Sequence, residues 1–131
     1  MPYSNYAKSK IVDHLFRGVA STPVSKVYIA FYISNPTDAD IGTEVTGGAY
    51  ARQEITYGEP SISGEDTIIQ NINIVTFPVA SSNWGMVTHY GIRDALTGGN
   101  LLQYGTFAIP QDVVQGNQPI VNVGESTLRL D

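Results

Sequence analysis

The chain has 131 residues, with 7 basic and 12 acidic side chains for a net charge of −5, and it contains no cysteine. This length fits one domain with a self-supporting core, so we expect residues 1–131 to form a single domain. The lack of cysteine excludes disulfides, thiolate metal sites and a cysteine nucleophile. The acidic balance and scattered basic residues argue against nucleic-acid binding, and no apolar run reaches the roughly 20 residues of a membrane span.

The first predicted element is a helix over about residues 4–18. Ser4 or Asn5 can supply the N-cap, Gly18 stands where helices commonly end, and Asp13 and Arg17 form a possible i,i+4 pair. An apolar stripe of this width has to lie against another surface. The stripe consists of Tyr6, Ala7, Ile11, Leu15 and Phe16.

The remainder of the chain, about residues 26–131, has the pattern of short strands separated by turns rich in Gly, Pro, Asn and Ser. Residues 26–34 alternate with apolar side chains on both faces, which predicts a central strand or one covered by the helix or another subunit. Gly98 and Gly99 favour a hairpin turn. Further strands are predicted at about residues 49–57, 67–77, 86–94, 100–109, 119–123 and 126–130. The expected fold is mainly β, an antiparallel, jelly-roll-like β-sandwich with one N-terminal α-helix.

Few residues suggest chemistry. Asp38, Asp40 and Glu44 lie on one loop, as hard cations require, but the full spacing of a calcium loop is missing, so no metal site is expected. His14 and His89 have no recognisable nucleophile or ligand motif around them. We therefore predict a protein without catalytic residues or cofactors.

The aromatic residues are more informative, because Tyr and Trp anchor both protein interfaces and sugar-stacking surfaces. We favour a protein interface, since the doubly apolar strand at residues 26–34 also needs a cover. The candidate interface residues are Tyr6, Leu15, Tyr28, Tyr32, Tyr50, Arg52, Trp84, His89, Tyr90 and Tyr104.

Several sequence blocks resemble one known family. They are residues 26–38 (KVYIAFYISNPTD), 47–53 (GGAYARQ), 84–94 (WGMVTHYGIRD) and 97–102 (TGGNLL), with a leading helix and a terminal LRLD. Together they resemble a family of small virion proteins of tailed bacteriophages and prophages, described as tail-fibre-like or capsid-associated. The resemblance implies a non-enzymatic virion protein that is assembled in the host bacterial cytoplasm and binds other virion proteins.

Three roles remain open at this point. A receptor-reaching fibre needs a long repetitive shaft, which 131 residues without repeats do not supply. The first hypothesis is therefore a capsid decoration protein that stabilises the head on the major capsid protein, as a homo-oligomer such as a trimer. The second is a tail-fibre base, adaptor or baseplate-associated module. The third is a carbohydrate-binding module for host attachment that uses Trp84, Tyr90 and Tyr104.

Overall fold

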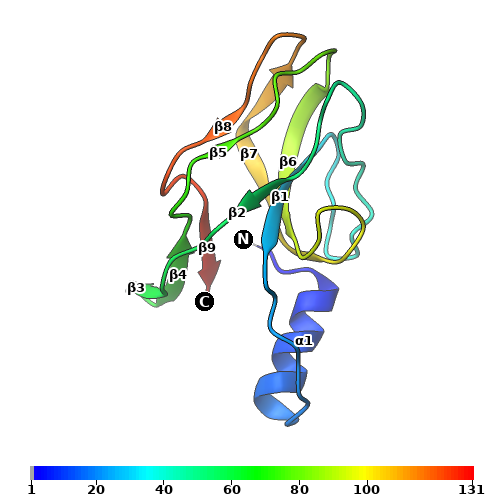
Figure 1. Ribbon diagram of the computed structural model, residues 1–131. Helices are drawn as coiled ribbons and strands as arrows, with labels where there is room; N and C mark the ends of the chain where they lie inside the picture. The colour runs from blue at the N-terminus through cyan, green and yellow to red at the C-terminus, as the bar shows by residue number, and fades with distance from the viewer. Residues whose placement is uncertain (1) are drawn as a thin grey trace.

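A computed structural model describes residues 2–131 of the chain. One helix precedes a series of short strands, and the long pair β6 and β7 forms the centre of the molecule (Figure 1). The elements are α1 (Asn5–Phe16), β1 (Val27–Tyr32), β2 (Gln53–Ile55), β3 (Ser61–Ser63), β4 (Asp66–Gln70), β5 (Val75–Thr76), β6 (Gly85–Arg93), β7 (Leu101–Val113), β8 (Ile120–Val121) and β9 (Thr127–Leu130).

The strands form two layers of antiparallel pairs. One layer is a four-stranded sheet in the order β2-β1-β6-β7, and the other is divided into the sheets β3-β4-β9 and β5-β8 (Figure 1). Strand β1 lies between β2 and β6, which confirms the prediction of a central strand from its two apolar faces. The predicted class, mainly β with antiparallel packed sheets and one N-terminal helix, is confirmed.

Helix α1 begins and ends where its capping residues predict. The Ser4 hydroxyl accepts a hydrogen bond from the Ala7 amide at 3.1 Å, as an N-cap does. Gly18 adopts a positive φ of 67° just after the helix, a conformation that costs glycine little. The predicted pair is present, with 2.7 Å between Arg17 and Asp13.

Some strand boundaries differ from the prediction. The expected strand 67–77 is two strands, because the buried Asn71 side chain donates to the carbonyls of Asn73 and Asn122 and takes the chain out of the sheet between them. Strand β3 was not predicted, since its polar sequence gives little signal. Strand β7 continues through Pro110, which is tolerated because β7 lies at the edge of its sheet.

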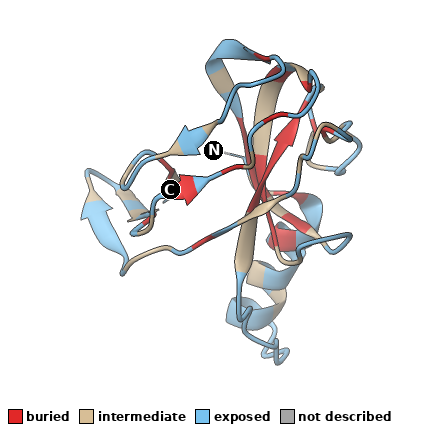
Figure 2. Cartoon of the chain, turned by 45° about the horizontal axis from the view of Figure 1, so that its top comes forward, coloured by how far each residue is buried: buried red, intermediate tan, exposed pale blue. Residues whose placement is uncertain are grey.

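The core lies between the layers and is rich in stacked aromatic rings. Phe31 and Phe77 stack with centroids 4.3 Å apart, and Trp84 meets Tyr50 edge-on at 5.3 Å. Figure 2 shows the buried residues gathered along the central sheet, while α1 is mostly exposed. A neighbouring side chain lies across Gly91 of β6: an added Cβ would be 2.9 Å from the Tyr32 ring.

Candidate binding surfaces

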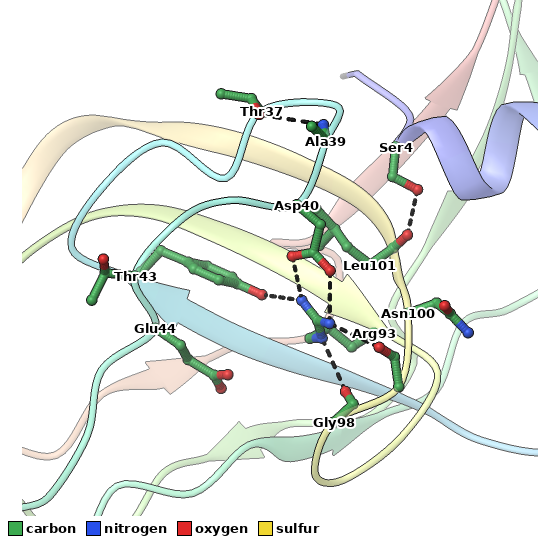
Figure 3. A network of polar contacts seen from close by, with 12 residues as sticks. Ser4, Thr37, Ala39, Asp40, Thr43, Glu44, Arg93, Gly98, Asn100 and Leu101 are labelled. Atoms are coloured by element: carbon green, nitrogen blue, oxygen red, sulfur yellow. Dashed lines mark hydrogen bonds and ion pairs between the residues drawn. The ribbon is translucent and has the colours of Figure 1, made fainter.

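Arg93, at the end of β6, ties two loops to the central sheet (Figure 3). Its guanidinium donates to both carboxylate oxygens of Asp40, at 2.7 and 2.9 Å, and to the Tyr32 hydroxyl at 2.9 Å. It also donates to the carbonyls of Gly98 and Gly99. Burial lowers the pKa of Arg93, but the bonds to Asp40 and Tyr32 outweigh burial and raise it, so the group stays charged.

A second ion pair lies close by and holds the same loops. Arg52 donates to both oxygens of Glu44, at 2.9 and 2.7 Å, and to the Ala95 carbonyl. The Tyr50 hydroxyl also donates to Glu44, at 2.7 Å. Burial acts to raise the pKa of Glu44, but the hydrogen bonds from Arg52 and Tyr50 lower it below its ordinary value. These two bidentate pairs are structural devices that fix loops.

The base of α1 is anchored to the body by its first turn. The Ser4 hydroxyl donates to the Leu101 carbonyl (Figure 3), and Asp38 accepts hydrogen bonds from Lys8 and Tyr104. These bonds hold the pKa of Asp38 below its ordinary value. Burial and the Asp38 carboxylate raise the pKa of Tyr104 to about 12, so the phenol remains a donor. The anchored end fixes the direction in which the rest of α1 projects.

The remaining turns of α1 expose Leu15 and Phe16 of the predicted stripe, together with Val12, which the prediction did not include. Only Ala7 of the helix is buried, whereas Val12 is 49%, Leu15 67% and Phe16 80% exposed. Val12, Leu15 and Phe16 have the spacing of one helix face. Figures 1 and 2 both show α1 projecting from the sheets, with its C-terminal end farthest from them. No described part of the chain covers this face, which we call the α1 stripe.

A hollow of about 740 Å³ lies between β7 and β8, at the other end of the molecule. Its lining is mixed: the aromatic residues Phe31, Tyr90 and Phe107 lie beside polar side chains such as Gln111 and Gln118. The two charged residues of its lining are acidic, Asp112 and Glu125. We call this the β7–β8 hollow, and its volume is in the range of known binding sites.

A second, more apolar hollow of about 550 Å³ lies between the central sheet and the β4–β9 pair. Gln103 lines it and is buried. The Gln103 amide Nε2 donates to the Arg129 carbonyl at 3.1 Å, while its Oε1 has no hydrogen-bond partner among the described residues. The hydrogen-bonding groups of this region are therefore less completely paired than those of the core around Phe77.

The acidic loop does not form one cation site. Asp38 pairs with Lys8, Asp40 with Arg93, and Glu44 with Arg52, so each carboxylate takes its own cation. Within residues 2–131 no group of three or more His, Asp or Glu side chains could hold a metal ion. The His89 ring bonds to the hydroxyl of its sequence neighbour Thr88, and burial lowers its pKa.

The predicted interface residues do not gather on one surface. Of that set only Tyr6 and Leu15 are exposed, and both are on α1. Tyr32, Trp84 and Tyr104 are buried within the chain; the Trp84 indole donates to the Gly48 carbonyl at 2.8 Å. The others, half-buried in the described structure, are Tyr28, Tyr50, Arg52, His89 and Tyr90. A sugar-binding platform of Trp84, Tyr90 and Tyr104 is therefore not assembled here, because two of its rings are inside the protein.

Sequence reasoning did not identify Arg93 or the β7–β8 hollow. A signal for Arg93 was available: a lone cation beside apolar residues of a central strand is retained only with a buried anionic partner. The residues of the hollow carry no such signal. Phe107, Ile120 and Glu125 lie far apart in sequence with ordinary neighbours, and only the tertiary fold brings them together.

A β-rich body with salt-bridged loops and a projecting apolar helix defines a structural, protein-binding module. The family model for the Podophage GP4 fiber I protein gp80 matches residues 2–129, and the chain belongs to this family of phage tail fibre proteins. A comparison with curated proteins finds no match. The protein is thus a non-enzymatic component of the virion, associated with other tail or fibre proteins. Membership of this family favours the fibre hypothesis over capsid decoration. No helix in residues 2–131 has the length and apolar character needed to cross a membrane.

Proposed function

We propose that this protein is a connector module of the tail fibre, which joins neighbouring fibre chains through the α1 stripe. The observation that carries the proposal is the exposure of Val12, Leu15 and Phe16 on a helix that projects from the body. Exposed apolar side chains clustered on one element are typical of protein-binding surfaces. The buried ion pairs of Arg93 and Arg52 hold the body rigid behind this helix.

The alternatives have weaker support. Capsid decoration is compatible with a β-rich, acidic chain, but the family is one of fibre proteins. Glycan binding through Trp84 requires an exposed ring, and Trp84 is buried.

The location can be tested with an antibody fragment against the β3–β4 hairpin, which is separate from α1 and exposes Ile62 (Figure 1). Electron microscopy of intact particles should show the fragment on the fibres. Labelling of the heads with none on the fibres would contradict the proposal and restore capsid decoration.

A further inference from the structure

The α1 stripe and the β7–β8 hollow have complementary properties. Helix α1 and its C-cap carry three of the chain's seven basic residues and one of its twelve acidic residues. That leaves four basic against eleven acidic side chains in the rest of the chain. The helix segment therefore has a net charge of 3 − 1 = +2, with Lys8 and Arg17 engaged in ion pairs to Asp38 and Asp13, and the rest of the chain has a net charge of 4 − 11 = −7.

The hollow has the character that such a helix requires. Its lining offers apolar contacts at Phe107, Ile120 and Val121 among polar side chains, and it contains Asp112 and Glu125 but no Lys or Arg. Neither carboxylate has an ion-pair partner among the described residues; Glu125 only accepts a hydrogen bond from the Asn122 amide. An incoming basic, apolar segment would bury apolar surface and meet negative potential at once.

The second hollow is a poorer partner for α1, because its lining includes the basic residues Lys26 and Arg129.

The helix of one molecule does not reach its own β7–β8 hollow. Figure 1 shows α1 and β8 at opposite ends of the molecule, and α1 contacts the body at β7 through its anchored first turn. A second copy of the chain can supply the helix instead. The α1 stripe and the β7–β8 hollow are different surfaces, so a contact between them is heterologous. Each copy can therefore bind one neighbour at each end.

We propose that the α1 stripe of one copy binds in the β7–β8 hollow of the next, with Phe16 and Leu15 inserted against Phe107 and Ile120. This inference rests on the connector role proposed above, and it names the neighbour as a second copy of this chain. The contact repeats head to tail, so copies join in a row or close into a ring such as a trimer.

A complementation experiment tests the proposal. Phe16→Asp removes the helix contact and Ile120→Asp removes the hollow contact, each at an exposed position. In sedimentation velocity, the wild-type chain should associate with rising concentration, and each variant alone should stay at the monomer mass of 14.2 kDa. An equal mixture of the two variants should form a 1:1 dimer, because Ile120→Asp keeps an intact helix and Phe16→Asp keeps an intact hollow. This dimer should grow no further, since its two remaining surfaces are the mutated ones.

The matched control is Ile62→Asp, at an 82% exposed position on β3, which should associate as the wild type does. Circular dichroism of all three variants checks that they fold. If Ile120→Asp unfolds, Glu125→Lys replaces it, since reversing this rim charge should weaken association about tenfold or more at low salt.

Three outcomes overturn the proposal: a monomeric wild type, a mixture that stays monomeric, and a control that loses association. If labelling still places the protein on the fibre in such a case, the connector role stands and the partner of α1 is a different fibre chain. If labelling places it on the head, the connector role itself fails.

Discussion

At the scale of single residues, the loops of the body depend on the side chains of Arg93 and Arg52. Arg93 makes five hydrogen bonds, and its side chain is only 8% exposed. Its guanidinium is the common partner of Asp40 and the Gly98–Gly99 turn, so its loss removes a direct tie between these two loops. A buried charge that loses its partner costs far more than an exposed pair contributes.

Replacing Arg93 should therefore be strongly destabilising. We expect Arg93→Met to lower the free energy of unfolding by about 3 to 5 kcal/mol, because it removes five hydrogen bonds and leaves the buried Tyr32 hydroxyl and the carbonyls of the Gly98–Gly99 turn without this donor. Urea denaturation measures the change. Arg129→Met is the control: its pair with Asp66 is solvent-exposed, so the expected loss is below about 1 kcal/mol. Equal losses for both variants would contradict this account of the loops.

Glu44 should make the protein sensitive to acid. Its folded pKa is below the ordinary value of 4.5, so its contribution to stability is complete above that value and is lost as the pH falls through the folded pKa. The stability difference between the wild type and Glu44→Gln should thus be largest near neutral pH and shrink as the pH falls below 4.5 and through the folded pKa. Urea midpoints across this range measure it, with exposed Glu59→Gln as the control for a lost charge. A difference that stays constant with pH would show that the Arg52 pair does not shift Glu44.

At the scale of elements, local sequence predicts most of what is observed. Alternating apolar residues place β1 in the centre, and Ser4 and Gly18 mark the ends of α1. The differences between the predicted and the observed elements arise from tertiary contacts. Asn71 divides a predicted strand because its side chain finds buried backbone partners 2 and 51 residues away. The apolar stripe of α1 predicted a cover for this helix, and residues 2–131 do not supply one, so that expectation stays a prediction.

Strand β1 offers a direct test of the element assignment. Phe31 is buried and stacks on Phe77, so Phe31→Ala should cost about 3 to 5 kcal/mol of unfolding free energy. Ile33, just beyond the strand, is an exposed control, and Ile33→Ala should cost less than about 1 kcal/mol. A similar small loss at both positions would mean that the inner face of β1 is wrongly assigned.

At the scale of the whole molecule, the candidate site could not be predicted residue by residue. The sequence indicates a virion protein with a surplus of tyrosines, but only Tyr6 of the eight is exposed, and three of the others hold loops through their hydroxyls. Tyr32 accepts a hydrogen bond from Arg93, Tyr50 donates to Glu44, and Tyr104 donates to Asp38. The partners of Tyr32 and Tyr104 lie 61 and 66 residues away, so the sequence alone does not indicate them. Two surfaces remain uncovered in the described structure: the α1 stripe at one end of the molecule and the β7–β8 hollow at the other.

The central claim is that α1 is covered when the protein is part of a fibre. Because the chain has no native cysteine, Val12→Cys places a single thiol on the α1 stripe while Leu15 and Phe16 remain. The measurement is the rate of maleimide labelling in the free protein and in intact particles, with Ile62→Cys as the control. We predict rapid labelling of both thiols in the free protein, and in particles a loss of labelling at position 12 alone. Equal labelling of both positions in particles would contradict the claim.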